Sequence, residues 1–354
     1  MKTEIAIDGT RFYINEKPTY EGVEWQGRPI EGLLFNSRMI QAIFDDSCPE
    51  TASRWAYPDT GVWDPERNTN EFCAALPEYR RHGLLGVTVG LQGGGSVYTQ
   101  PLYDTFENSA FDRDGSLKPA YLERLVRVLK AADDCGMIVI VNYFYFKHLR
   151  RFKSEALIKS MAEAATDWLL RTGFRNILVD VFNEANRKRP DRLTNSEGVH
   201  ELIEIVQQTT LGGRRLPAGS SSGGGQSRAE GRWLEIEDFC MPHGNGLTPD
   251  GLRAKLRDLK SDPLFARKPR PILVNEDSIF TENMDAAIEE YASWGFYCQG
   301  YGSVYKDRMD WTVRERESRY EELSGFQTMP VNWSINTEIK KAFFSHVLEV
   351  TQGK

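Results

Sequence analysis

The sequence lacks several features that would assign a chain to a particular class. Its five cysteines are widely spread and form no Cys-x-x-Cys pair, so neither a disulfide framework nor a zinc cluster is indicated. No stretch approaches the roughly 18 apolar residues that a membrane span needs. The glycine-rich runs at 93–95 and 223–225 lack the spacing and the Gly-Lys-Ser/Thr ending of phosphate-binding loops. We therefore expect no membrane contact, no cofactor and no metal.

An excess of basic charge is also missing. The net charge is -7 and the pI is near 5.5, so nucleic-acid binding would lack its main electrostatic contribution. The N-terminus turns polar at once and does not fit a secretory signal, which leads us to expect a cytoplasmic protein. With 40% hydrophobic and 27% charged residues, the composition is typical of a globular protein with a large core. The sequence leaves the oligomeric state open.

Short runs rich in β-branched residues recur along the chain, each followed by a turn and a stretch with helical periodicity. Eight runs fit strands: 31–35, 85–91, 137–143, 177–183, 216–220, 238–242, 272–275 and 296–300. Seven segments fit helices: 71–81, 119–135, 154–172, 196–209, 248–259, 284–294 and 337–350. Eight such units with near-continuous apolar strands favour a closed parallel barrel over an open sheet. The prediction is an α/β fold, one (β/α)8 TIM barrel domain over residues 1–354.

Segments outside these units are expected at the two ends of the barrel. Residues 1–29 contain turn residues at Asp8-Gly9 and at 15–18 and predict a β-hairpin that caps the lower end. Three long connections, at 36–70, 92–118 and 301–336, follow strands one, two and eight. Loops of this length are usually functional, and barrel enzymes keep their sites on this face.

Two carboxylates end the fourth and seventh predicted strands. The fourth ends in ILVDVFNEAN, and the side-chain period of two places Asp180 and Glu184 on the inner face. The seventh ends in PILVNEDS, where the same period groups Ile272, Val274 and Glu276. Retaining hydrolysis of a glycosidic bond needs two carboxyl groups ~5 to 5.5 Å apart, one acid and one nucleophile. The sequence predicts Glu184 as the general acid/base and Glu276 as the nucleophile.

This pattern resembles that of the clan A glycoside hydrolases, which include the cellulase and mannanase group called family 5. In that clan an Asn-Glu pair closes strand four and a Glu closes strand seven, as Asn183-Glu184 and Glu276 do here. The resemblance implies that Asn183 contacts the sugar 2-hydroxyl. His243, in FCMPHGNG, resembles the histidine that family 5 has at the end of strand six. The implied substrate is a poly- or oligosaccharide.

The chain departs from the clan pattern at three places. Strand two offers no arginine to bond the nucleophile, and Arg38, after strand one, is the candidate substitute. Asn245 stands where an aromatic residue usually follows the histidine by two. Strand eight usually ends in a tryptophan, whereas GFYCQGYGS offers Tyr297, Gln299 and Tyr301 as substrate-binding candidates. These departures indicate a divergent member rather than a mainstream cellulase.

Polar side chains at the ends of strands two and three complete the predicted substrate site. Gln92, Asn142 and Tyr145 are candidates for hydrogen bonds to sugar hydroxyls, although each residue type also satisfies turns and strand ends in many proteins. Their place on the C-terminal face of the barrel makes them candidates, and both interpretations stay open.

Two other functions stay open. A metal-dependent barrel enzyme, such as a sugar isomerase or lyase, would use Glu184, Glu276, Asp277 and His243 as ligands. The absence of a His-x-His motif argues against it. A carbohydrate-binding protein with a decayed site is permitted by the missing arginine in strand two, although the presence of both glutamates argues against it.

Overall fold

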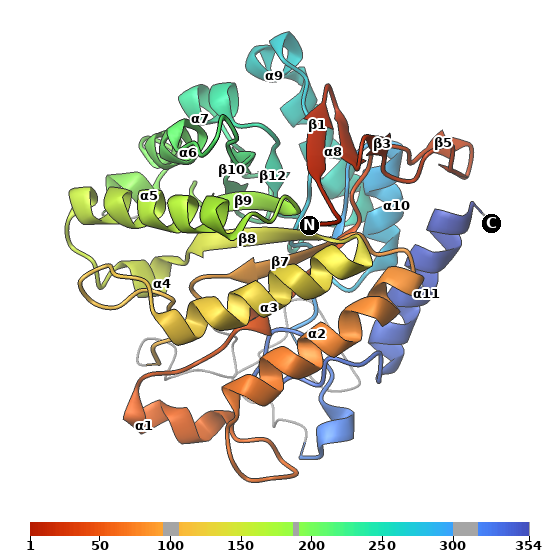
Figure 1. Cartoon of the computed structure of the whole chain (residues 1–354). Helices are drawn as coiled ribbons and strands as arrows, with labels where there is room; N and C mark the ends of the chain where they lie inside the picture. The colour runs from red at the N-terminus through yellow and green to blue at the C-terminus, as the bar shows by residue number, and fades with distance from the viewer. Residues whose placement is uncertain (95–105, 187–190, 300–317, 354) are drawn as a thin grey trace.

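Strands that run through the centre of the molecule are surrounded by helices (Figure 1). The computed structural model describes residues 1–94, 106–186, 191–299 and 318–353. Six strands form one sheet in the order β10-β9-β8-β7-β6-β13. Their bounds are β6 Asn36–Arg38, β7 Gly86–Gly90, β8 Ile138–Phe144, β9 Ile177–Phe182, β10 Ala218–Gly219 and β13 Gly295–Phe296. The pairs within this sheet are parallel, as βα repeats require.

Short pairings beyond this sheet close the ring. β11 (Ser221–Ser222) pairs in parallel with β12 (Met241–Pro242). Single parallel bridges then join Cys240 to Ile272 and Leu273 to Ser293, two residues before β13. Because β13 pairs with β6, the chain returns to its first strand. The predicted (β/α)8 barrel is confirmed.

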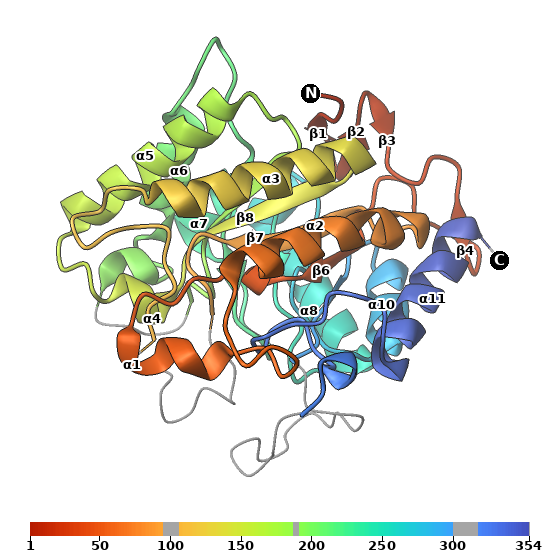
Figure 2. The same cartoon turned by 60° about the horizontal axis from the view of Figure 1, so that its bottom comes forward.

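Helices cover the outside of this ring. They are α2 (Pro65–Arg81), α3 (Pro119–Cys135), α5 (Glu155–Thr172), α6 (Val199–Gln208), α7 (Gly231–Ile236), α8 (Pro249–Ser261), α10 (Thr281–Glu289) and α11 (Glu338–Gln352). Shorter helical turns are α1 (Pro49–Ala52), α4 (Phe146–Leu149), α9 (Pro263–Arg267), η1 (Ile40–Ala42), η2 (Ser53–Trp55), η5 (Arg192–Thr194) and η7 (Tyr320–Glu322). Figure 2 shows α2 and α3 side by side over β7. Gly136 and Gly173 end α3 and α5 at φ 70° and 80°, which glycine adopts without strain.

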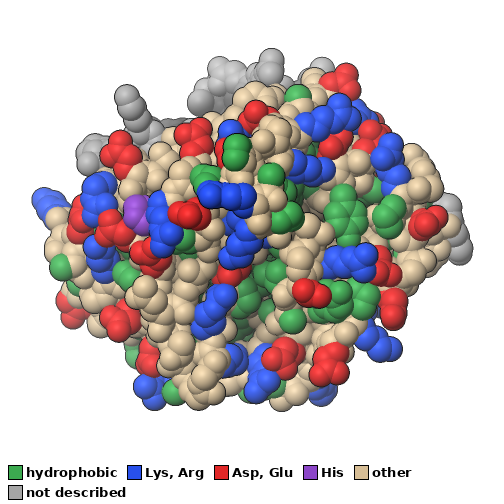
Figure 3. All heavy atoms as spheres, turned by 90° about the horizontal axis from the view of Figure 1, so that it is seen from above, with side chains coloured by type: hydrophobic (Ala, Val, Ile, Leu, Met, Phe, Trp, Pro, Cys, Tyr) green, Lys and Arg blue, Asp and Glu red, His purple; other side chains and the backbone are tan. Residues whose placement is uncertain are grey.

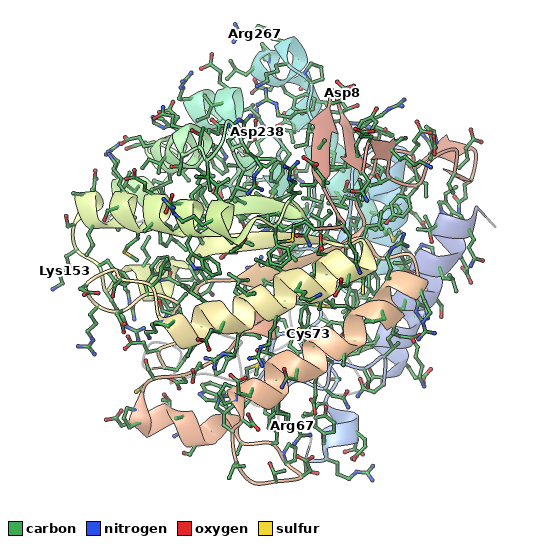
Figure 4. The ribbon with its side chains drawn as sticks, viewed as in Figure 1. Asp8, Arg67, Cys73, Lys153, Asp238 and Arg267 are labelled. Atoms are coloured by element: carbon green, nitrogen blue, oxygen red, sulfur yellow. The ribbon has the colours of Figure 1, made fainter. Side chains whose placement is uncertain are left out.

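The long connection after β6 is anchored at the start of α2. Asp64 caps this helix by accepting from the main-chain N–H groups of Glu66 and Arg67. The guanidinium of Arg67 lies 4.0 Å from the ring centre of Tyr57. Figure 4 shows Arg67 at the edge of the molecule, beside the first turns of α2. The cap and the cation–π contact therefore fix this loop to its helix.

The N-terminal hairpin is present as predicted. β1 (Ile5–Asp8) pairs antiparallel with β2 (Arg11–Ile14), and β3 (Lys17–Pro18) extends this sheet, while β4 (Glu24–Trp25) and β5 (Arg28–Pro29) form a separate pair. Phe12 is fully buried. Its apolar cluster consists of Ile5, Phe12, Leu34, Leu85, Ile138, Ile140, Leu178, Phe239, Met241 and Leu273. These residues come from the hairpin and from barrel strands, so the hairpin packs into the barrel interior.

Two strand predictions need correction. Strand one begins at Asn36 rather than within 31–35, because a turn at 31–32 precedes it, and Arg38 is therefore its last residue. In the seventh segment, Leu273 belongs to the interior cluster, whereas Ile272 and Val274 pack in the larger cluster. Ile272 and Val274 therefore share one face, as predicted, but that face packs in the larger cluster and not in the interior cluster. Single bridges replace a ladder there, so the strand period does not extend to Glu276.

The surface carries both signs of charge. On the face shown in Figure 3, basic and acidic side chains are interspersed. Ion pairs link neighbouring helices, as between Arg253 of α8 and Glu289 of α10. The five cysteines are free thiols. Across the described ranges, no helix has the length and apolar character to cross a membrane.

Candidate active site

Glu184 lies two residues beyond β9 in an unusual backbone conformation. Its φ is 58°, in the left-handed region that costs strain for a residue with a side chain. The neighbouring strands hold this turn in place: the N–H of Asn183 donates to the carbonyl of Phe144 at 3.0 Å. The N–H of Glu184 donates to the hydroxyl of Ser221 at 3.2 Å. The strained turn is therefore fixed from both sides at the carboxyl end of the barrel.

Glu276 is held by two donors, one on each carboxylate oxygen. The Nε of Arg38 lies 2.7 Å from Oε2, and the Nδ2 of Asn245 donates to Oε1 at 2.9 Å. The Glu276 carbonyl accepts from the N–H of Gly244 at 2.8 Å, which ties the end of strand seven to the end of strand six. Glu276 is therefore fixed in both backbone and side chain.

The two glutamates face each other across His243. Its Nδ1 lies 3.4 Å from Oε1 of Glu184 and 3.6 Å from Oε2 of Glu276. One carboxylate oxygen of each glutamate lies within 4.8 Å of the other. His243 is fully buried, and each glutamate is 8% exposed. The two carboxyl groups therefore lie close together at one end of the barrel.

Arg38 joins the ends of strands one, four and seven. Besides Glu276, it reaches Asn183, whose Oδ1 accepts from Nη2 at 2.8 Å. Arg38 is 2% exposed, and within the described ranges its Nη1 has no hydrogen-bond partner. Burial is the largest influence on the pKa of Arg38 and lowers it, but Glu276, Tyr297, Asp180 and Tyr145 together outweigh burial and leave that pKa raised. The arginine thus stays charged although it is buried.

A buried polar layer supports these residues from below. Asp180 is fully buried and accepts from the Nδ2 of Asn142 and from the N–H of Ser221, each at 2.9 Å. Burial raises the pKa of Asp180, although the nearby charges of Arg38 and His243 act to lower it. The same Ser221 accepts from the N–H of Glu184 through its hydroxyl, so the layer also orients the glutamate turn.

Two of the predicted sugar-binding residues, Gln92 and Asn142, form hydrogen bonds with buried protein groups. Gln92 is fully buried, accepts from the N–H of Tyr145 at 3.0 Å and donates to Ser109 at 3.3 Å. Asn142 is equally buried and bonds Asp180. Gln92 and the Nδ2 of Asn142 therefore bond protein groups, and their predicted contact with sugar stays a prediction.

The remaining predicted residues lie at the ends of strands three and eight. Tyr145 and Tyr297 are each 7% exposed, and both interact electrostatically with Arg38. Gln299 is partly buried, and its carbonyl accepts from Thr328 at 2.5 Å. Tyr301 lies outside the described residues. Tyr145 and Tyr297 therefore remain the aromatic candidates beside the carboxyl pair.

A cation could be held by Glu184, His243 and Glu276, which offer one ligand atom each within 4.8 Å. Asp277, predicted as a further ligand, does not complete such a set. Its Oδ2 accepts from Asn283 and Trp294 at 2.8 Å each. The guanidinium of Arg38 also occupies Oε2 of Glu276 and would repel a second cation there. The donor set therefore suits hydrogen-bonding chemistry better than metal coordination.

Comparisons with known proteins support the fold. No protein-family model matches the chain, and no curated protein matches its sequence. A glycoside hydrolase family 5 mannosidase from Rhizomucor miehei superposes with a TM-score of 0.53 at 12% identity, covering 99% of this chain and 98% of that one. A family 5 glycoside hydrolase from Prevotella bryantii, in complex with a xyloglucan tetradecasaccharide, gives 0.51 at 10% identity, covering 75% and 89%. An endo-1,4-beta-mannanase from Rhizomucor miehei gives 0.50 at 10% identity, covering 83% and 89%. The chain therefore has the barrel fold of family 5 glycoside hydrolases.

Proposed function

We propose that this protein is a retaining glycoside hydrolase that cleaves O-glycosidic bonds in a poly- or oligosaccharide. The carboxyl pair is the observation that carries the proposal: Glu184 and Glu276 follow strands four and seven, with oxygens within 4.8 Å. A pair this close suits direct attack by one carboxylate, as in retaining enzymes with carboxyl groups ~5 to 5.5 Å apart, better than the ~6.5 to 9.5 Å of inverting enzymes. The fold agrees with this class, since the structures named above are glycoside hydrolases.

Glu276 is proposed as the nucleophile because its surroundings suit a carboxylate that must stay charged. The guanidinium of Arg38 offsets its negative charge, and Asn245 fixes the second oxygen. Glu184, on the other side of His243, is proposed as the acid/base. The Oδ1 of Asn183 accepts a hydrogen bond from Arg38, so we propose that the Asn183 amide nitrogen donates to a sugar hydroxyl.

The reaction follows from these positions in two balanced steps. Glu184 gives its proton to the glycosidic oxygen as the bond from that oxygen to the anomeric carbon breaks, and an oxygen of Glu276 bonds to this carbon. Glu184 then takes a proton from water, the water oxygen attacks the same carbon, and the bond to Glu276 breaks. Two inversions give net retention and restore both carboxyl groups.

Hydrolysis of aryl glycosides and a polysaccharide panel, with the first-formed anomer followed by NMR, tests the proposal. Glu276→Gly should abolish turnover, and azide should then yield a glycosyl azide of inverted configuration. Glu184→Ala should lower kcat by roughly 10²- to 10⁴-fold on poor leaving groups, less on activated ones, and azide should give the opposite anomer. Glu282→Gln, on the exposed side of α10, is the control and should behave as wild type.

Other outcomes would support the competing functions. Turnover that vanishes with a chelator and returns with a divalent cation would favour a metal enzyme that uses Glu184, His243 and Glu276. Glycan binding without turnover across the panel would favour a decayed, carbohydrate-binding site. Wild-type activity in Glu276→Gly would refute the assignment of the nucleophile.

A further inference from the structure

Lys255, in α8, is a buried lysine that the reaction above does not use. It is 1% exposed, whereas most lysines extend to solvent. Its Nζ donates to two main-chain carbonyls, that of His243 at 2.6 Å and that of Gly223 at 2.9 Å. Burial lowers the pKa of Lys255 to about 7, although the charges of Asp277 and Glu184 act to raise it. Burial removes the hydration of this amine, and its hydrogen bonds to the two carbonyls must offset that cost.

Both carbonyls belong to segments that carry the candidate site. His243 lies between the two glutamates, and its N–H donates to the carbonyl of Ser222 at 3.0 Å. Gly223 follows β11, and its N–H donates to the Oδ1 of Asn186 at 2.7 Å. Asn186 is two residues after Glu184, on the same turn. The Lys255 amine therefore joins α8 to the segment of the histidine and to the segment that holds the glutamate turn.

We propose that Lys255 is a positioning residue for this site, an inference that rests on the proposed function. Its hydrogen bond to the His243 carbonyl fixes the position of the imidazole between the carboxyl groups. Its hydrogen bond to the Gly223 carbonyl stabilises the hydrogen bond from the Gly223 N–H to Asn186. Small displacements of catalytic groups have large effects on rate. Lys255 touches neither substrate nor the reacting atoms, so its loss should reduce kcat more than substrate affinity.

Lys340 provides a matched control elsewhere in the molecule. It lies in α11 and is fully buried. Its Nζ donates to the carbonyl of Asn332 at 2.6 Å and to the Oδ1 of Asn336 at 2.8 Å. It also donates to the carbonyls of Ser334 at 3.4 Å and Leu323 at 3.5 Å, and none of these four residues belongs to the candidate site. Lys340→Met therefore removes a buried lysine of the same kind without disturbing His243.

The experiment compares kcat and KM of wild type, Lys255→Met, Lys255→Arg and Lys340→Met on one aryl glycoside, each protein being first checked for folding by circular dichroism. We expect Lys255→Met to lower kcat by roughly 10- to 100-fold with KM nearly unchanged. Lys255→Arg keeps N–H donors and should recover part of this loss. Lys340→Met should keep kcat close to wild type.

A folded Lys255→Met with wild-type kcat would overturn the proposal, as would an equal loss in Lys340→Met or no recovery in Lys255→Arg. If Lys255→Met does not fold, Lys255→Arg takes its place in the test. A kcat below wild type with KM nearly unchanged would support the proposal, and a wild-type kcat would overturn it. The imidazole NMR signals of His243 give a readout that needs no turnover. Lys255→Met should shift them and Lys340→Met should not. Absence of wild-type hydrolysis would refute the proposed function alone, whereas unshifted His243 signals would refute the positioning role.

Discussion

Arg38 offers the sharpest single-residue test of the site. Its Nε and Nη2 point to different residues, Glu276 and Asn183, at 2.7 and 2.8 Å. A lysine would keep the charge, but its one ammonium group cannot reproduce the planar, two-directional arrangement. We therefore expect Arg38→Lys to lower kcat/KM on the order of 100-fold, measured on the substrate that wild type hydrolyses.

Arg124 serves as the control for this substitution. It is also a buried arginine with two acidic partners, Asp45 and Glu66, and neither belongs to the candidate site. Arg124→Lys should therefore keep kcat/KM near the wild-type value. Equal losses in the two variants would show that Arg38 has a general structural role rather than one in the proposed reaction.

The predicted residues that the structure brings together are those whose place depends only on strand order. Glu184 and Glu276 end strands four and seven, and a barrel brings such ends to one face. Asn245 and Lys255 were not predicted as part of the site. Asn245 was noticed only as a departure from an aromatic position, and nothing in a helical lysine signals burial. Their roles depend on side-chain direction, which strand and helix patterns do not encode.

At the scale of elements, helices were predicted better than strands. α3 has the predicted bounds, 119–135, because its amphipathic repeat is long and Gly136 ends it. The seventh strand appears only as isolated bridges, and α7 and α9 are too short to show a period. For a strand of two or three residues, the sequence pattern has less effect on strand formation than the packing of neighbouring segments. This explains why the eight units were found while several of their boundaries were not.

The junction between α7 and β12 makes a prediction about pH and stability. Glu237 follows α7, is fully buried and accepts from the Nε1 of Trp233 at 2.8 Å. Burial raises the pKa of Glu237 from 4.5 to about 8. The folded protein therefore keeps a proton that the unfolded chain releases above its own pKa. Stability from this group is complete below about pH 4.5 and is lost as the pH rises through about 8.

Glu237→Gln should remove this contribution to the pH dependence. The difference in the free energy of unfolding between Glu237→Gln and wild type should shift in favour of the variant by up to about 1.4 kcal/mol per pH unit over that interval. Urea denaturation at several pH values between these limits measures it. Glu235→Gln, an exposed neighbour on α7, should show the wild-type slope. Parallel stability curves for Glu237→Gln and wild type would contradict the prediction.

At the scale of the whole molecule, closure of the ring creates the site. Arg38, Asn183, His243 and Glu276 come from the ends of strands one, four, six and seven, and they meet only because β13 returns to β6. At the opposite end of the barrel, Phe12 and Ile5 of the N-terminal hairpin fill the interior. In the proposed function, the barrel thus separates two tasks: the carboxyl ends of the strands carry the candidate site, and the amino ends contribute to stability.

Phe12→Ala tests this separation. Phe12 is fully buried and lies edge-on to Phe239, with ring centres 6.2 Å apart, so truncation leaves a cavity inside the barrel. We expect a loss of about 3 to 5 kcal/mol in the free energy of unfolding, measured by urea denaturation. Well below the unfolding transition, kcat/KM should match wild type, because the catalytic groups lie at the other end. Tyr13→Ala, at the next and partly exposed position of β2, should cost less than about 1 kcal/mol. A fall in kcat/KM for Phe12→Ala at temperatures where it is fully folded would mean that the two ends are coupled through the barrel interior.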